Sequence, residues 1–562
     1  MSVHDFVSAP ARAFTLHMAS LAATTDTTDT TDTTDTDTTD TTDTGTVDVT
    51  AEARALLAGL AARPWGNASP SVYETGRLVS LAPWLAGHDE RLAYLVATQR
   101  PGGGWGAHSD YALVPTLSAT ESLLAELARG TRDPTPAAEA AGKGLHALFR
   151  WSRRDYGSPL PDMPAIELVV PSLIRSINRH LDDLRDAPVD GLRTWAGAPP
   201  LPLPAGVDGA RLEMIRSRLR SGAPLPEKLL HALEVAGDAG FQAPGVRPTA
   251  AGTVGASPAA TAAWLGELGA REPGHPARAH LESAAEQHGG PVSCAVPITA
   301  FERGWVLSWL VRAGIPVTVP EDLVESLGAG LGPGGLSAGP GLPADADTTS
   351  VALYALALLG APREPDSLLG YHTGTHFCTW QGEQGFSTTV NAHVLDALGQ
   401  YVRARPGARA RYGEPMDRLA GWLRGRQNPD GSWPDRWHVS PYYATVCCAL
   451  ALDEFGGPAA RDSVRRAVRW VLSTQRADGS WGLWRGTAEE TAYAMQSLLL
   501  TQTTHDEPAH GKIITQGYAY LLRSAGRSDD PPMWIDKDLY FPGAIVRAAI
   551  LGAMHLAQRQ GR

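Results

Sequence analysis

Apolar residues recur at the spacing of amphipathic helices along most of the chain after residue 47. Such a pattern predicts helices that bury one face and expose the other. One example is the set Val464, Ala467, Val468 and Val471. The segment 445–452 is instead apolar at every position after the first, which predicts a helix buried on all sides. Because strand-like alternation is sparse, the pattern predicts an all-α protein with helices of about 10 to 18 residues.

A short pattern, Gln followed by five residues and Trp, occurs three times between predicted helices. The copies are QRPGGGW at 99–105, QNPDGSW at 427–433 and QRADGSW at 475–481. The glycine suits a tight turn, the Gln amide can bond to the turn backbone or to the end of the next helix, and the Trp can fill the gap between outer helices. We interpret the repeats as structural, and they favour α/α-barrels built from helical hairpins.

The length of 562 residues predicts more than one domain, since single hydrophobic cores stop growing at about 250 to 300 residues. The turn-rich segment QHGGPVSCAVP at 287–297 suggests a boundary near residue 300. We therefore predict an α/α-barrel domain at 47–300, whose first helix could pack with the other domain, and a second at 301–562. Residues 1–46 include a Thr/Asp repeat without apolar residues, which predicts a disordered tail.

Composition narrows the class of protein. Hydrophobic residues make up 43% and charged residues 19%, as in ordinary soluble globular proteins. The formal net charge is −12, to which the Thr/Asp repeat contributes seven aspartates, so nucleic acid is not an expected partner. Four cysteines without CxxC spacing, no signal peptide and no run of 18 apolar residues predict a cytoplasmic protein without a transmembrane segment. Oligomeric state is not indicated.

The segment PADADTTS at 343–350 contains the strongest candidate chemistry. It follows a Gly-rich loop and precedes an apolar helix. On one interpretation, Asp345 or Asp347 merely caps the helix. On the other, repulsion between the two carboxylates together with burial raises the pKa of one, so that it stays protonated and can protonate an alkene. The helix N-terminus would oppose this second interpretation by stabilising the anion.

The same segment resembles the DxDD-type motif of class II terpene cyclases, in a DxDTT form. Further segments resemble the same family: SPAATA at 257–262, GGPV at 289–292 with Pro297, Phe301, Glu302 and Trp305, STTVNAHVLDAL at 387–398, WHVSPYYAT at 437–445, TAEETAY at 487–493, WIDKDLYFPGAIVR at 534–547 and IELVVPSL at 166–173. The resemblance covers about residues 60 to 550. It implies two α/α-barrels, a γ-like domain and a β-like domain, with an active site between them.

The resemblance implies roles for the acid motif. Asp347 is the implied general acid, and Asp345 is implied to polarise or hydrogen-bond it. Thr348 stands where the family has a last aspartate. A neutral hydroxyl there leaves less repulsion to raise the pKa of Asp347, so burial and Asp345 would have to supply more of the shift.

Aromatic and basic residues complete the candidate site. Aromatic faces stabilise carbocations without acting as nucleophiles; the candidates are Phe301, Trp305, Trp309, Trp380, Tyr442 and Tyr443. Alternatively, these aromatic residues belong to the hydrophobic core. Lys537 and Arg547 are candidate diphosphate ligands. The resemblance also implies Mg²⁺, for which Glu167 is the best-placed acid, because the upstream acidic element of the family is degraded here to YGSP at 156–159.

Two further features of the sequence have both a functional and a structural interpretation. The string DDLRD at 182–186 looks like the metal motif of class I terpene synthases, but it ends a helix and no second metal motif accompanies it, so we interpret it as a solvated terminus. The diphosphate should therefore remain in the product. His393 is a candidate base for the final deprotonation, although a lone histidine in an apolar helix is more often a core residue.

The leading functional hypothesis is a class II cyclase that converts a linear prenyl diphosphate into a bicyclic diphosphate. Trp264 follows the SPAATA segment, and if it lines the pocket it would shorten it, which slightly favours farnesyl diphosphate and a drimenyl-type product. The alternative is geranylgeranyl diphosphate and a copalyl, labdane or clerodane-type product. A squalene-hopene-type cyclase is less favoured because Lys537 and Arg547 suit a charged substrate. A non-enzymatic barrel, with both aspartates as caps, is the least favoured.

Overall fold

The computed structural model describes residues 47–561, except for 64, 132, 158, 503–509 and 528. The predicted disordered tail lies outside the described residues. The chain is mostly helical and contains only four strands of two residues each in its described part, so the all-α prediction is confirmed. None of the described helices is long and apolar enough to cross a membrane.

Six helices form a closed inner ring in the C-terminal half. They pack in chain order, and the last packs against the first: α11 (Thr299–Arg312), α13 (Ala346–Leu358), α14 (Thr388–Ala404), α16 (Pro441–Phe455), α18 (Ala488–Leu500) and α20 (Gly543–Arg559). An outer layer surrounds this ring and consists of α12 (Glu321–Ala329), α15 (Arg409–Gly425), α17 (Arg461–Ser473), α19 (His510–Arg523) and α1 (Val49–Ala62). This arrangement is an α/α-barrel.

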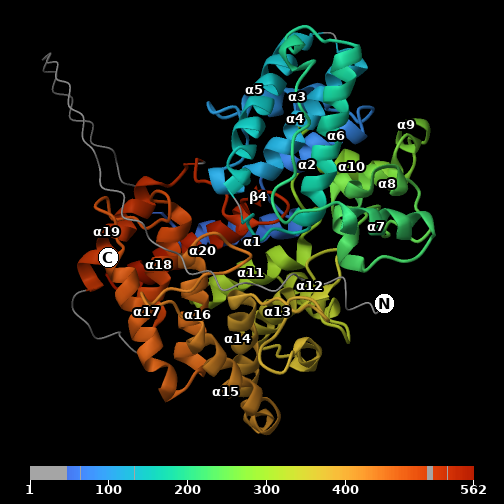
Figure 1. The fold of residues 1–562 in the computed structure, drawn as a ribbon. Coiled ribbons are helices and arrows are strands. Elements are labelled where there is room, and N and C mark those ends of the chain that lie inside the picture. The colour runs from blue at the N-terminus through green and yellow to red at the C-terminus, as the bar shows by residue number, and fades with distance from the viewer. Residues whose placement is uncertain are drawn as a thin grey trace, which may run out of the picture.

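A second barrel occupies the N-terminal half. Its inner elements are α2 (Val72–Leu81), α4 (Leu113–Arg129), α6 (Ile166–Asp186), the 3-10 segment η5 (Glu227–Ala239) and α8 (Pro258–Leu265), and α8 returns to α2. Further helices of this half are α3 (His88–Ala97), α5 (Pro134–Ser152), α7 (Ala210–Arg220), α9 (Leu268–Arg271) and α10 (Pro276–Glu286). Figure 1 shows the two halves side by side, in blue to green and in yellow to red.

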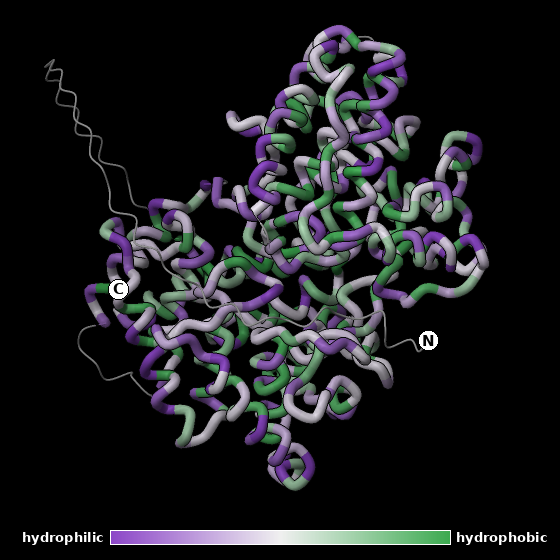
Figure 2. Tube along the Cα trace, viewed as in Figure 1, coloured by the Kyte–Doolittle hydropathy of each residue, from purple (hydrophilic) through white to green (hydrophobic). Residues whose placement is uncertain are grey.

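Each barrel has its own hydrophobic core. The buried apolar residues of the N-terminal core lie between Val72 and Val296. Most of those in the C-terminal core lie between Trp305 and Ala557. Four residues of α1 also belong to this core, because α1 packs against α20 although it precedes the N-terminal barrel in sequence. Figure 2 shows apolar stretches alternating with polar stretches along the helices, as the sequence pattern requires.

The three Gln-Trp turns have the same hydrogen bonds. In each, the Gln amide donates to the carbonyl of the turn glycine and to a carbonyl of the helix packed beside it: Gln99 to Gly103 and Ala140, Gln427 to Gly431 and Ser463, and Gln475 to Gly479 and Ile513. The indole N–H of each Trp donates to a carbonyl of the preceding helix. The turns therefore join neighbouring outer helices and carry no reactive group of their own.

Two small hairpins bring chemically important residues to the junction of the barrels. Strand β1 (Leu336–Ser337) pairs antiparallel with β2 (Ala344–Asp345), which leads directly into α13. Strand β3 (Trp534–Ile535) pairs with β4 (Leu539–Tyr540), which precedes α20. The first hairpin positions the acid motif, and the turn of the second reaches the N-terminal barrel.

Candidate active site

The acid motif lies at the N-terminal end of α13. Asp345 is the N-cap, and its Oδ1 accepts a hydrogen bond of 2.6 Å from the backbone N–H of Thr348. Thr349 Oγ1 accepts from the backbone N–H of Leu336 at 2.8 Å, which ties the start of the helix to β1. The helix-cap interpretation therefore holds for Asp345, and Thr348 serves as the partner of that cap.

Asp345 is buried and its carboxyl is perturbed. Burial raises the pKa of Asp345 to about 7, and the charge of Asp347 adds to the rise, although the Thr348 N–H opposes it. The structure contains no hydrogen bond between the two carboxyl groups. Asp345 thus influences Asp347 through charge, in contrast to the direct hydrogen bond that was one of the two roles expected.

Asp347 is instead paired with His393. Its Oδ1 lies 2.6 Å from Nδ1 of His393, and both side chains are largely buried, with 15% and 10% of their surface exposed. Burial alone would lower the pKa of His393, but the Asp347 carboxylate raises it well above its usual value. The Asp347 carboxylate therefore favours the protonated form of the His393 ring. His393, expected as a core residue or a final base, is the partner of the acid.

An aromatic group surrounds this pair. The Trp305 ring lies 5.5 Å from the His393 ring and perpendicular to it, and the Trp305 indole N–H donates to Tyr443 Oη at 2.7 Å. Phe301 packs on Trp305 at 4.2 Å, and Trp534 from β3 contacts Phe301, Trp305 and Tyr443. Among the predicted aromatic residues, Phe301, Trp305 and Tyr443 are thus brought together beside the acid.

The remaining predicted aromatic residues lie elsewhere. Trp309 is one turn farther along α11, where it packs on Tyr493 and lines a small cavity together with Trp305 and His393. Trp380 packs edge-on against Trp437 at 5.4 Å, near the junction of the barrels. Tyr442 packs on Trp470 of the outer helix α17, so it faces away from the inner ring. For Tyr442 the prediction is wrong, because adjacent residues on a helix point in different directions.

Lys537 does not have the environment of a diphosphate ligand. Its side chain is fully buried and pairs with Glu74 and, at 3.0 Å, with Glu234. It also donates to the carbonyl of His231 and to Ser257 Oγ. Burial lowers the pKa of Lys537, but the two glutamates raise it above its usual value. The ammonium group is already satisfied, so the structure contradicts the predicted role.

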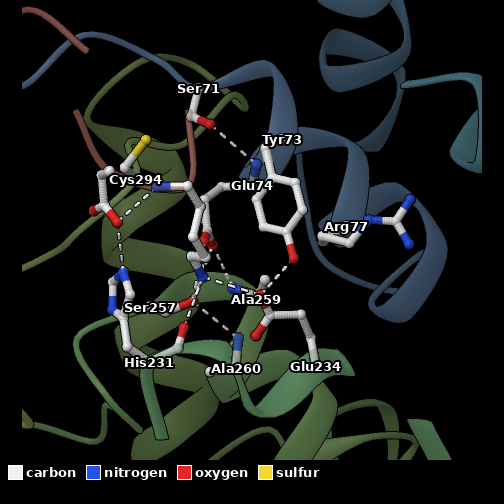
Figure 3. A network of polar contacts seen from close by, with 12 residues as sticks. Ser71, Tyr73, Glu74, Arg77, His231, Glu234, Ser257, Ala259, Ala260 and Cys294 are labelled. Carbon is white, nitrogen blue, oxygen red and sulfur yellow. Dashed lines mark hydrogen bonds and ion pairs between the residues drawn. The ribbon is translucent and has the colours of Figure 1, made fainter. Parts of the chain in front are cut away.

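The groups around Lys537 come from both barrels. Figure 3 shows Glu74 on α2 opposite Glu234 and Ser257, with His231 at the edge of the network. His231 Nε2 lies 3.0 Å from Asp536 Oδ1 on the β3–β4 turn. Because Glu74, Glu234 and Ser257 belong to the N-terminal barrel and Lys537 to the C-terminal half, this buried network joins the two barrels.

Arg547 lies at a different place on the same junction. Its guanidinium pairs with Glu52 of α1 at 2.9 Å, and it lines a hollow of about 260 Å³ together with Arg63 and Glu302. The structure does not bring it together with Lys537. Its proposed contact with a diphosphate stays a prediction.

The residues present do not form the magnesium site that the resemblance implied. Glu167 is about half exposed, and its charged neighbour is Arg211 at 3.8 Å. Within the described part of the chain, no group of three or more His, Cys, Asp or Glu side chains is placed to hold a metal ion. Mg²⁺ as a cofactor stays a prediction.

Trp264 does not line a pocket beside the acid. It is buried in the core of the N-terminal barrel, where its ring lies 5.8 Å from that of His275 at the start of α10. The argument that Trp264 shortens the substrate pocket is therefore wrong, because its side chain packs between α8 and α10.

Sequence analysis missed several residues of the site. His393 was predicted as a base for the final deprotonation and not as the partner of Asp347, since nothing in the sequence indicates that α14 packs beside α13. Trp534 lies in a segment that resembles the family, but a strand of two residues is too short to produce a hydrophobic periodicity that would have predicted its position. Lys228 and Arg436 were also missed. Lys228 Nζ lies 5.7 Å from the centre of the Trp380 ring, and Arg436 lies over Trp437 at 5.0 Å.

The protein is thus an all-α double barrel in which a buried aspartate–histidine pair lies beside aromatic rings. A model of the squalene-hopene cyclase C-terminal domain matches residues 385–529. The chain is 43% identical over 512 residues to the ent-copalyl diphosphate synthase of Streptomyces sp. (strain KO-3988), covering 91% of this chain and 96% of the relative.

A second relative and a solved structure indicate the same family. The chain is 40% identical over 523 residues to the labda-7,13-dienyl diphosphate synthase of Streptomyces clavuligerus, covering 91% of this chain and 94% of that relative. The solved structure of ent-copalyl diphosphate synthase from Streptomyces platensis is similar with a TM-score of 0.86 and 46% identity, covering 91% of this chain and 100% of that one. The chain belongs to the bacterial class II terpene cyclases.

Proposed function

We propose that the protein cyclises geranylgeranyl diphosphate to a bicyclic diphosphate of the copalyl type, with Asp347 as the general acid. The observation that carries this proposal is the buried Asp347–His393 pair, which lies beside the ring of Trp305. A proton donor enclosed by aromatic rings suits a reaction that begins with protonation of an alkene and continues through carbocations.

The proposed chemistry begins with the proton held by the pair. That proton passes to the Asp347 carboxyl and then to the terminal alkene carbon, which leaves a tertiary carbocation. Successive alkenes attack the cation and close two rings. The faces of Phe301, Trp305 and Trp534 would stabilise the moving positive charge and keep water away. Loss of a proton ends the reaction, and the diphosphate stays on the product.

The relatives support the C20 substrate. Several are named copalyl or labdadienyl diphosphate synthases, and they cover nearly the whole chain. The preference for farnesyl diphosphate and a drimenyl-type product depended on Trp264, which packs in the core of the N-terminal barrel. The alternative substrate therefore becomes the main proposal.

Lys228 is the proposed diphosphate ligand. Arg436 is a weaker candidate, because its guanidinium is already paired with Glu383 at 2.8 Å and with Asp162 at 3.1 Å. Both basic residues approach the Trp380–Trp437 pair from different barrels, Lys228 from η5 and Arg436 from the loop before α16. Trp437 reaches the acid motif through Thr379: its indole N–H donates to Thr379 Oγ1 at 3.4 Å, and the Thr379 carbonyl accepts from the N–H of Ala346. No ion pair of Lys228 occurs within the described residues. Its charge is therefore available to a phosphate.

The test is incubation with geranylgeranyl, farnesyl or no diphosphate, followed by phosphatase treatment and mass analysis. We expect a bicyclic C20 alcohol from the wild-type protein. Asp347→Asn should lower the rate by ~10²- to 10⁴-fold and still bind the substrate. Lys228→Gln should raise KM and leave kcat nearly unchanged. Cyclisation of farnesyl diphosphate in preference to the C20 substrate, or full activity of Asp347→Asn, would overturn the proposal.

A further inference from the structure

A buried glutamate that the proposed chemistry does not use lies against the aromatic rings of the site. Glu489 is the second residue of the inner helix α18, and none of its side chain is exposed. Its Oε1 accepts the indole N–H of Trp534 at 2.9 Å and the phenol O–H of Tyr493 at 3.1 Å. The same indole ring packs on Trp305, the neighbour of the His393 ring. A carboxyl group is thus bound to the edge of a ring beside the acid.

A histidine is the third donor to the same carboxyl oxygen. His438 Nε2 lies 3.0 Å from Glu489 Oε1, and none of the His438 side chain is exposed. Nδ1 of this ring accepts the backbone N–H of Ser440 at 3.0 Å, so Nδ1 carries no proton. The ring proton is therefore on Nε2, where it donates to Glu489, and the imidazole is neutral. His438 holds Glu489 in place without cancelling its charge.

The three donors identify the Glu489 carboxyl as an anion. An indole N–H can only donate, so the oxygen that accepts it carries no proton. The other oxygen, Oε2, forms no hydrogen bond within the described part of the chain, so a proton there would have no acceptor. Among the described residues, no lysine or arginine forms an ion pair with Glu489. A fully buried carboxylate without a counter-cation is costly to the fold, which indicates a role beyond packing.

The charge of Glu489 reaches the same region as the charge of Asp347. Tyr540 is the pairing partner of Trp534 in the β3–β4 hairpin, and the two rings lie 6.4 Å apart. Burial raises the pKa of Tyr540, and the charges of Asp347 and Glu489 are among those that add to the rise. The phenol of Tyr540 is therefore within electrostatic reach of both carboxyl groups. Glu489 lies close enough to influence a cation that forms beside Trp534.

We propose that Glu489 is a positioning residue for cyclisation: its carboxylate holds the Trp534 ring beside the carbocation and makes that ring more electron-rich. An N–H that donates to an anion shifts electron density onto the ring, so the ring face attracts a cation more strongly. The neutral alkenes of the substrate gain little from this, whereas the cation gains much, so the effect increases kcat and leaves substrate binding alone. This inference rests on the proposed carbocation cyclisation.

The test combines Glu489→Gln with two analogues of geranylgeranyl diphosphate. The amide oxygen of Gln can still accept the three hydrogen bonds, but the charge is removed. One analogue has a dimethylammonium group in place of the terminal alkene, and the other has an isopropyl group of the same shape. In the variant, the inhibition constant of the ammonium analogue should rise by ~10-fold and that of the isopropyl analogue should stay unchanged. The kcat should fall by a similar factor at an unchanged KM. Equal changes for both analogues, or no change for either, would overturn the proposal.

The adjacent residue provides a matched control. Glu490 is also buried, but its carboxylate accepts from Ser440 Oγ and from the backbone N–H of Leu483, away from the Trp534 ring. Glu490→Gln should leave kcat and both inhibition constants unchanged. Weaker binding of the ammonium analogue to this variant, by as much as in Glu489→Gln, would reveal a general effect of buried charge and overturn the specific role.

A second substitution keeps the proposal testable if Glu489→Gln does not fold. Replacement of Trp534 by 3-benzothienylalanine keeps the shape of the two rings but puts sulfur where the indole has its N–H. This change breaks the contact with Glu489 at the ring itself. It should weaken binding of the ammonium analogue and leave binding of the isopropyl analogue unchanged. Unaltered binding of the ammonium analogue would overturn the role of Glu489.

The role of Glu489 and the role of Asp347 fail separately. If Asp347→Asn remains fully active while Glu489→Gln binds the ammonium analogue less tightly, only the acid assignment fails. If Asp347→Asn is inactive while Glu489→Gln keeps the wild-type kcat and inhibition constants, only the role of Glu489 fails.

Discussion

His393 Nδ1 lies 2.6 Å from Asp347 Oδ1, and this contact joins the second turn of α14 to the first turn of α13. It turns an aspartate that alone could be a helix-terminal residue into half of a buried proton-holding pair. The rings of Trp305 and Tyr443 lie 5.5 Å and 6.3 Å from the His393 ring, so the pair has aromatic neighbours.

Replacement of His393 by Gln should preserve a hydrogen bond to Asp347 but remove the charge. We expect kcat to fall by ~10²-fold or more, since the proton is no longer held beside the carboxyl. The folded-state pKa of His393 is raised, so the pair stabilises the fold fully below about pH 6.5 and loses this contribution as the pH rises through the raised pKa. Denaturant unfolding at pH 6 and at higher pH should show that the difference in free energy of unfolding between the wild type and the variant becomes smaller as the pH rises. A difference in free energy of unfolding that does not change with pH would contradict the ion pair.

Asp345→Asn should change the pH dependence of stability. The pKa of Asp345 is raised from 3.8 to about 7 on folding, so its contribution is full below pH 3.8 and is lost as the pH rises through 7. Asn can also cap α13 but does not titrate. Relative to the wild type, the variant should gain about 2 to 4 kcal/mol in free energy of unfolding between pH 4 and pH 8. Parallel stability curves for the two proteins would refute this.

Lys537→Met should unfold more easily without a specific defect in substrate binding. It leaves Glu74 and Glu234 buried without their counter-charge, which costs about 3 to 5 kcal/mol. Thermal melting and KM measured on the folded fraction separate this from a role in diphosphate binding. The matched variant Lys228→Met should show the reverse, with a raised KM and an unchanged melting temperature. A normal melting temperature with a raised KM for Lys537→Met would restore the original prediction.

Two adjacent tyrosines allow a matched comparison. Tyr443→Phe removes the acceptor for the buried indole N–H of Trp305, which should cost about 1 to 3 kcal/mol in stability and disturb the ring beside His393. We expect slower cyclisation and more early-terminated products by mass analysis. Tyr442→Phe, whose ring packs on Trp470 of α17, should leave the product profile unchanged. Equal effects of the two variants would argue against the enclosure described here.

The hydrophobic pattern was sufficient to predict the helical class and the buried inner helix at 445–452, because a period of 3.6 residues reports directly on which faces meet a core. The Gln-Trp turns were similarly informative, since their hydrogen bonds are mostly local or involve the helix packed alongside. Asp345 and Asp347 could be singled out because both belong to one short segment that begins a helix.

Tertiary structure alone decided which residues surround that segment. His393 and Asp347 are 46 residues apart, and Lys537 reaches Glu234 across 303 residues. Such contacts depend on how helices and hairpins pack, which local periodicity does not specify. Lys537 illustrates the consequence: its residue type suits a phosphate, but its burial between two carboxylates makes it a structural ion. The sequence by itself therefore determined the class of fold and the position of the aspartate pair. Packing decided the partner of Asp347 and the surroundings of each basic residue, because charge and burial are properties of neighbours in space.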